Sequence, residues 1–209
     1  MHSTEQLFAI QNEIYNKIQL AEPKLIQIKE KAVPLMEKWQ EFLEIILPIQ
    51  LGVIKNHNFE ANQLGLSKFN EEYSRCSLNS TPLRELTAQK WLFMFDKAFG
   101  VTEFKEISLQ EAQNLVSEIV TEMTSDSFLA QIDNLINSLH SEASLIEKRQ
   151  AVLTLLLPLH MSVMARHGFA GETGYIQAQR AIMDYYHDPL IAQKTVYAQT
   201  IVFKRAQLI

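Results

Sequence analysis

Four side chains in the second half of the sequence have the types and spacing that metal or acid–base chemistry would need. His160 and His167 are seven residues apart, so a helix would place both on one face, together with Met164. Such a face could offer imidazole and thioether ligands to a soft metal ion. Asp184 and His187 form a local acid–histidine cluster of the kind that general acid–base catalysis uses. One hypothesis is therefore a small-molecule or metal-dependent helical enzyme that uses His160, His167, Asp184 and His187.

A structural explanation competes with the enzymatic one at these positions. His167 lies where the last turn of a helix is expected, and the first half of the sequence has Gln50 where the second half has His160, so a metal ion would have too few ligands. Asp188 precedes Pro189 and is better placed as the N-cap of a helix than as a general base. We therefore favour core and capping roles for these side chains.

Signatures of known catalytic sites are absent from the sequence. It contains no Walker loop, nucleophile elbow, HExxH motif or paired CxxC motif. The stretch GFAGETG, residues 168–174, could hold an anion on backbone N–H groups, but no lysine or serine completes a phosphate site. Cys76 has only Arg75 beside it, which is too little to activate a thiol. We predict that the protein is not an enzyme and that it holds no cofactor and no metal ion.

Length and composition limit the remaining classes of protein. The chain has 209 residues, of which 47% are hydrophobic, so it can build the core of one large domain or two small ones. Its net charge of −5 is spread over both halves, which argues against a nucleic-acid partner. The longest apolar run, residues 151–164, is too short to span a bilayer, and no signal peptide is recognisable. With a single cysteine, these features favour a cytoplasmic protein that is not inserted in a membrane.

One stretch of the sequence occurs twice. The residues ILPIQLGVIKNHNF, 46–59, return as LLPLHMSVMARHGF, 156–169. Aligning 33–59 with 143–169 needs no gap and gives ten identical pairs out of 27. The economical interpretation is an internal duplication that produces two tandem repeats.

The spacing of apolar residues predicts an all-α fold with four helices in each repeat. In the first repeat, residues 1–104, we expect helices over about 3–20, 23–56, 62–74 and 81–100. In the second repeat, residues 105–209, we expect them over about 108–123, 127–166, 172–186 and 188–206, with an interruption of the long helix near His140. Each long second helix contains a proline and should bend there, and Pro34 should add a bend in the first repeat. The repeats are expected to pack through their apolar faces with approximate twofold symmetry.

The end of the repeated stretch is typical of a helix stop. In each copy the residue before the final phenylalanine is Asn or Gly, the types that best tolerate the left-handed conformation. The histidine before it can bond the free carbonyls of the last turn, at the negative end of the helix dipole. Each proline is either a tolerated kink or a means of offering a free carbonyl to a ligand. The helix-stop motif comprises Pro48, His57, Asn58 and Phe59 in the first copy and Pro158, His167, Gly168 and Phe169 in the second.

With these two copies aligned, the chain resembles the small animal proteins catalogued as the C-ten family. The first copy matches the family's pattern through Leu47-Pro48, Val53-Ile54-Lys55, Phe59, Gly65 and Lys68-Phe69. The second copy matches it through Leu157-Pro158, Val163-Met164, Gly168-Phe169 and Gly174, and residues 107–120 resemble the family's first helix. The first copy departs from the pattern by Asn58 in place of Gly, and the second lacks the Lys-Phe pair. The resemblance implies a tandem duplication of one helical domain and carries over no enzymatic residue.

The chain is also similar in character to the small acidic helical adaptors of bacterial type IVB secretion coupling complexes. This similarity rests on size, acidity and a composition rich in Lys, Asn, Gln and Ile. It implies an adaptor or chaperone-like subunit within a secretion complex.

The aromatic stretch WLFMFDKAF, residues 91–99, is the candidate binding surface. Its apolar side chains leave little of the helix circumference polar, so a helix there must be covered on two sides. Either it is buried between the two repeats, or it lines a groove for a partner or a homodimer interface. We predict that an apolar helical segment of a partner protein binds there. The predicted partner-binding residues are Trp91, Phe93, Met94, Phe95 and Phe99, with Phe203 of the last helix on the opposite wall.

Overall fold

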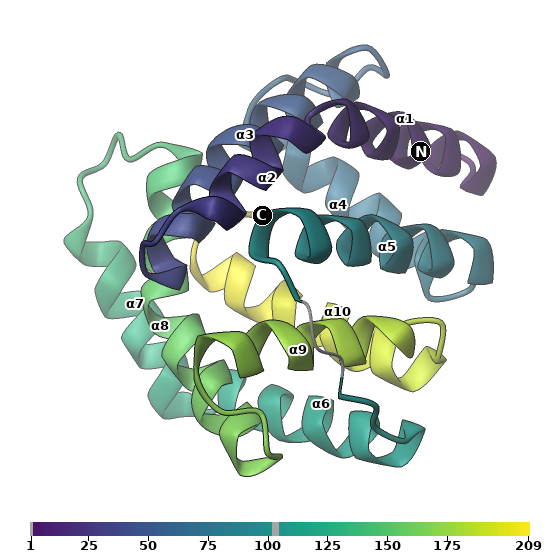
Figure 1. The fold of residues 1–209 in the computed structure, drawn as a ribbon. Helices are drawn as coiled ribbons and strands as arrows, with labels where there is room; N and C mark the ends of the chain where they lie inside the picture. The colour runs from purple at the N-terminus through teal and green to yellow at the C-terminus, as the bar shows by residue number, and fades with distance from the viewer. Residues whose placement is uncertain (1, 102–104) are drawn as a thin grey trace. The chain divides into compact units, whose positions relative to one another are not determined.

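A computed structural model of the protein describes residues 2–101 and 105–209 (Figure 1). In these residues the regular secondary structure consists of ten α-helices and one π-helix, without a strand, which confirms the prediction of an all-α protein. The chain divides into two compact units, Met1–Thr102 with Ile209, and Glu103–Leu208. The predicted boundary between the repeats, after residue 104, falls on a segment outside the described residues.

Each unit is built around one central helix. The first unit, purple to teal in Figure 1, has α1 (Thr4–Leu20), α2 (Glu22–Glu30), α3 (Leu35–Lys55), α4 (Gln63–Ser77), α5 (Thr81–Met94) and the π-helix η1 (Phe95–Phe99). The second has α6 (Leu109–Met123), α7 (Asp126–Ser138), α8 (Leu145–Arg166), α9 (Gly171–Asp184) and α10 (Pro189–Arg205). α3 packs against α1, α2 and α4, and α8 packs in the same way against α6, α7 and α9.

The long second helix that we predicted for the first repeat is two separate helices in the structure, and the interruption that we predicted near His140 in the second repeat is confirmed. In the first unit the chain leaves the helix at Lys31 and re-enters it after Pro34, whose ψ of 152° is extended. A proline disfavours helical conformation in the residue before it, so the break precedes Pro34. In the second unit the break runs from Leu139 to Ser144, which caps α8. Among the described residues each unit therefore has five α-helices, not four.

Both first helices begin with the same local device. Ser3 accepts a hydrogen bond from the backbone N–H of Gln6, whose side chain bonds back to the backbone of Ser3. Ser108 and Glu111 form the same reciprocal capping box at the start of α6. Apolar side chains spaced along α1 form one buried stripe, because Leu7, Ile10, Ile14 and Ile18 are each at most 1% exposed.

The aromatic stretch does not continue as an α-helix. α5 ends at Met94, and the next five residues form η1, in which the Gly100 N–H donates to the Phe95 carbonyl at 3.2 Å. A π-turn adds one residue and rotates the side chains that follow it. Gly100 ends the segment with φ 67°, and a Cβ on it would lie 2.7 Å from the side chain of Lys29 in α2. Its left-handed conformation favours glycine there, and a larger residue would also have to displace the flexible side chain of Lys29.

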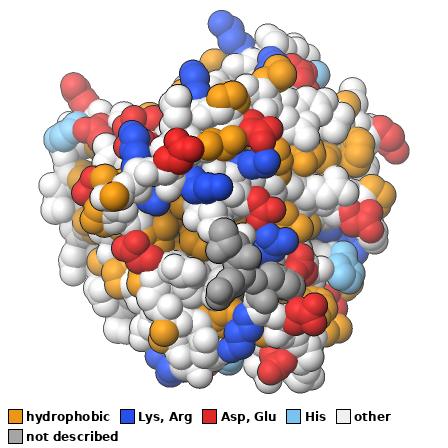
Figure 2. All heavy atoms as spheres, viewed as in Figure 1, with side chains coloured by type: hydrophobic (Ala, Val, Ile, Leu, Met, Phe, Trp, Pro, Cys, Tyr) orange, Lys and Arg blue, Asp and Glu red, His pale blue; other side chains and the backbone are white. Residues whose placement is uncertain are grey.

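On the face of the molecule in Figure 2, basic and acidic side chains are interspersed among hydrophobic ones. None of the described helices combines the length and the apolar character needed to cross a bilayer.

Two further glycines allow α4 and α9 to lie directly on the loops that precede them. A Cβ on Gly65 would lie 1.9 Å from the backbone oxygen of Glu60, and one on Gly174 would lie 2.4 Å from the backbone carbon of Phe169. Contacts this short cannot be relieved by rotating a side chain, because the neighbouring atoms are backbone. The first turn of each helix therefore needs a glycine at this position.

We predict that Gly65→Ala lowers the free energy of unfolding by about 2 kcal/mol, because the backbone must shift to admit the methyl group. Gly52→Ala is the matched control, since Gly52 also lies in a helix but a Cβ there would meet no atom within 4 Å. This control should raise stability by about 0.5–1 kcal/mol, the usual gain of alanine over glycine in a helix. Urea unfolding followed by circular dichroism measures both changes. Equal effects of the two substitutions would contradict the close approach.

Candidate functional site at the end of the central helix

The central helix of the first unit ends in a tight left-handed turn. Asn58 has φ 65°, and the N–H of Phe59 donates to the carbonyl oxygen of Ile54 at 3.2 Å. This bond, from the residue after the left-handed position to the carbonyl group five residues earlier, is the one that characterises a Schellman motif. The ring of Phe59 is then folded back into the core and is 8% exposed.

The second unit closes its central helix in the same way. Gly168 has φ 82°, and the N–H of Phe169 donates to the Met164 carbonyl at 2.9 Å. Phe169 is 2% exposed. The burial class of every residue from 47 to 60 is the same as that of the residue 110 positions later, so the two ends are also alike in what they bury. Pro48 and Pro158 both lie inside the central helix, at exposed positions.

The histidine before each left-handed residue bonds the first helix of its unit. The Nε2 atom of His57 lies 2.9 Å from Glu13 in α1, and that of His167 lies 2.7 Å from Glu118 in α6. Hydrogen bonds from His57 and then from Lys17 hold the pKa of Glu13 below its usual value. Those from His167 and then from Arg166 lower the pKa of Glu118 in the same way. We call these two pairs the histidine–glutamate clamps.

A basic side chain lies on the carbonyl end of each central helix. His2 Nε2 lies 3.2 Å from the His57 carbonyl oxygen, and the His2 ring stacks on Phe59 with centroids 4.6 Å apart. In the second unit, Lys105 Nζ donates to the carbonyl oxygens of His167 at 3.4 Å and Gly168 at 3.3 Å. That ammonium also lies 4.6 Å from the ring centroid of Phe169. The side chains of His2 and Lys105 thus each lie at the negative end of a helix dipole and against the face of an aromatic ring.

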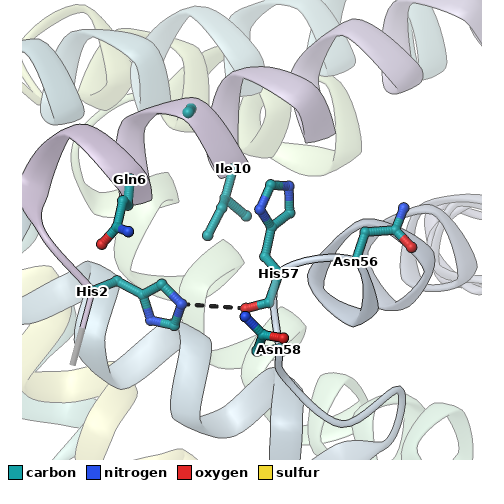
Figure 3. A pocket seen from close by; sticks show the side chains of 7 residues that line it. His2, Gln6, Ile10, Asn56, His57 and Asn58 are labelled. Atoms are coloured by element: carbon teal, nitrogen blue, oxygen red, sulfur yellow. Dashed lines mark hydrogen bonds between the residues drawn. The ribbon is translucent and has the colours of Figure 1, made fainter.

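In the first unit these residues border a pocket of about 250 Å³ between the start of α1 and the end of α3 (Figure 3). The close-up shows the ring of His2 directed at the carbonyl of His57, beside the side chain of Gln6. The walls combine apolar side chains of α1 with imidazole and amide groups, and they are formed by His2, Gln6, Ala9, Ile10, Asn56, His57 and Asn58.

The predicted partner-binding residues separate into distinct groups. Trp91 and Phe99 are half-buried, and Met94 and Phe95 are buried. Trp91 stacks on Phe95 at 5.4 Å, and the group continues through Phe99 to the rings of α3. The rings of this aromatic cluster belong to Trp39, Phe42, Trp91, Phe95 and Phe99.

Phe93 and Phe203 lie outside that cluster. Phe93 makes an edge contact with Tyr15 of α1 at 5.9 Å, and Lys97 lies 5.8 Å from its ring centroid. Phe203 is in the second unit, where the Arg149 guanidinium lies 5.3 Å from its ring centroid. The six predicted residues therefore do not form one continuous surface within a unit.

The residues of the enzymatic hypothesis have different surroundings. His160 stacks on Tyr175, and its Nε2 atom lies 3.2 Å from the sulfur of Met123, whereas His167 is held by Glu118. Asp184 and His187 are exposed, and Asp188 accepts backbone N–H bonds as the N-cap of α10. Within the part of the chain that the structure describes, no three His, Cys, Asp or Glu side chains converge so as to hold a metal ion.

The residues that contact the two helix-stop motifs were not predicted from the sequence. They are His2, Lys105, Glu13 and Glu118. One sequence feature points to the two glutamates, since each lies ten residues after the serine that caps its helix. His2 and Lys105 precede their helices by different distances, and no motif marks them.

Comparison of the chain with protein-family models, with curated proteins and with solved structures found no match.

The surroundings of His160 generate a prediction for the pH dependence of stability. Burial lowers the pKa of His160 to about 4, and its Nδ1 atom is buried without a hydrogen-bond partner among the described residues. Because the folded state keeps this ring neutral while the unfolded chain takes up a proton below its ordinary pKa, stability should fall as the pH falls from 7 to 5. Replacing it with glutamine, the residue at position 50 of the first unit, removes this proton uptake.

We expect wild type to lose about 1 kcal/mol more than His160→Gln between pH 7 and pH 5. Urea unfolding at the two pH values measures the difference. His140→Gln is the control, because the side chain of His140 is 65% exposed. If both substitutions change the pH dependence equally, burial of His160 is not its cause.

Proposed function

We propose that the protein is a non-enzymatic adaptor or chaperone-like subunit that binds an apolar helical segment of a partner protein. The observation that carries the proposal is the aromatic cluster of the first unit. Five rings pack there with centroid distances of 4.6 to 6.5 Å, yet Trp91 and Phe99 remain half-buried. Aromatic side chains anchored by a packed base and open on one side are the residue type that dominates the energetics of protein interfaces.

A second feature of the cluster supports this proposal. Trp39 is 6% exposed, and among the described residues its indole Nε1 has no hydrogen-bond partner. A buried donor without an acceptor is costly, so native structures keep few of them. Because this donor is buried, a partner could accept its hydrogen bond only if the rings of the cluster move on binding.

We propose further that the two units arose by duplication of one helical unit. The common helix order, the two helix stops and the two histidine–glutamate clamps support this proposal. We also propose, from the sequence alone, that the duplicated unit is a domain resembling the C-ten family. The proposed membership of a secretion coupling complex likewise rests on the sequence alone.

The proposal predicts that Trp91→Ala weakens partner binding while Phe93→Ala does not. Both residues are half-buried aromatics of α5, but Phe93 packs on Tyr15, away from the cluster. Removing a central aromatic anchor typically weakens an interface by about 2 kcal/mol or more, which is about thirtyfold in affinity. Affinity purification of the full chain from its native cell, followed by mass spectrometry, identifies the partner, and titration with the purified partner measures the affinities.

Thermal melting by circular dichroism must show that both variants fold. An undiminished affinity of folded Trp91→Ala, or the same loss with Phe93→Ala, would exclude the aromatic cluster as the binding surface. Light scattering shows whether the partner is a second copy of the chain. Stoichiometric metal in the purified protein that is lost in His167→Ala would favour the enzymatic alternative instead.

A further inference from the structure

Both ring nitrogens of His2 face groups that accept hydrogen bonds. Nδ1 lies 3.0 Å from Glu72 Oε2, and Nε2 lies 3.2 Å from the His57 carbonyl oxygen. The backbone N–H of His2, which donates to the same Glu72 oxygen at 3.0 Å, is the main cause of a lowered Glu72 pKa, so the carboxylate is ionised at neutral pH. A carbonyl and a carboxylate accept but do not donate. The two ring bonds therefore exist together only when both nitrogens carry a proton.

The His2 ring also contacts an aromatic ring and the end of a helix. The ring stacks on Phe59, with centroids 4.6 Å apart and planes inclined by 21°. It also lies at the carbonyl end of α3, where the helix dipole is negative. The ionisable groups around it are Glu72 from α4 and, at the end of α3, His57, which is itself paired with Glu13 of α1.

The second unit has a cation at the corresponding place that does not change its charge. Lys105 bonds the His167 and Gly168 carbonyls and covers Phe169, as His2 bonds the His57 carbonyl and covers Phe59. A lysine ammonium stays charged through the neutral pH range, whereas histidine is the side chain that changes charge there. The same contact is thus built with a titrating residue in one unit and a permanent cation in the other.

We infer that His2 is a proton-operated latch on the first unit. As an imidazolium it ties the start of α1 to the end of α3 and to α4, and it forms one wall of the pocket in Figure 3. Loss of the proton removes one of the two ring bonds and the charge that faces the helix dipole. The segment before α1 is then held only by the remaining ring bond, the backbone bond to Glu72 and the cap of α1, so this wall of the pocket loosens. This inference does not depend on the adaptor function proposed above.

The protonation state of His2 can be observed directly. Long-range ¹H–¹⁵N spectra of the histidine side chains, recorded on the full chain between pH 5 and 9, distinguish an imidazolium from the two neutral tautomers. We expect both nitrogens of His2 to be protonated at pH 6 and one of them to lose its proton as the pH rises. A neutral His2 ring at pH 6 would overturn the inference.

Amide exchange of the residues around the latch tests its consequence. Exchange rates corrected for intrinsic pH dependence should show about tenfold less protection of the Phe59 amide at pH 8 than at pH 6, because a hydrogen bond to a charged group is lost. The Phe169 amide should show no such change. His2→Lys should remove the pH dependence at Phe59, and Lys105→His should create one at Phe169.

A pH-dependent change at Phe59 that is the same in wild type and in His2→Lys would contradict the latch, because its cause would then lie elsewhere. His2→Gln provides a further readout, since it keeps one hydrogen bond but never the charge. It should show the low protection at both pH values. High protection in His2→Gln at both pH values would also contradict the inference.

Discussion

The left-handed turn that ends α3 and α8 is the constraint on which the rest of each unit depends. A single residue with positive φ reverses the chain, and the phenylalanine after it is thereby driven into the core. The loop beyond it runs so close to the following helix that only glycine fits in the first turn of α4 and of α9. The histidine before the turn then reaches the glutamate of the first helix. Three of the five α-helices of a unit, the central helix, the one that follows it and the first one, are thus positioned from one point.

The two units meet this common constraint with different side chains. Position 39 of the first unit is Trp39, whose ring packs on Phe99, whereas the matching position of the second is Arg149, which lies over Phe203. Burial lowers the pKa of Arg149 to about 10, which marks an unusual environment for a guanidinium. The first unit thus has an aromatic cluster where the second has an arginine. The two units thus have helices in the same order but different side chains at this position. The aromatic side chains give the first unit the surface that we propose for binding.

Local rules predicted much of this fold from the sequence. The capping boxes at Ser3 and Ser108 depend on residues three apart, and the apolar stripe of α1 depends on helical periodicity alone. The left-handed residues at 58 and 168 could be foreseen because few residue types tolerate that conformation. The long second helix was predicted wrongly in the first unit because Pro34 was treated as a bend, whereas a proline disfavours helical conformation in the residue before it and the helix is broken there.

The candidate site could be predicted less well, because it is made by residues far apart in the sequence. Glu13 and His57 are 44 positions apart, and no short motif joins them. The π-turn after Met94 takes the residues that follow it out of the α-helical register, so helical periodicity could not place Phe99 relative to Trp91.

The most direct test of the contacts made at the left-handed turn is a double-mutant cycle at pH 6 on each clamp, with glutamine replacing His57, Glu13 or both, and likewise His167 and Glu118. We expect a coupling energy of about 0.5–1 kcal/mol between the histidine and the glutamate of each clamp, in the upper range for partly exposed ion pairs. A coupling no larger than that of the exposed pair His140–Glu147 would contradict it.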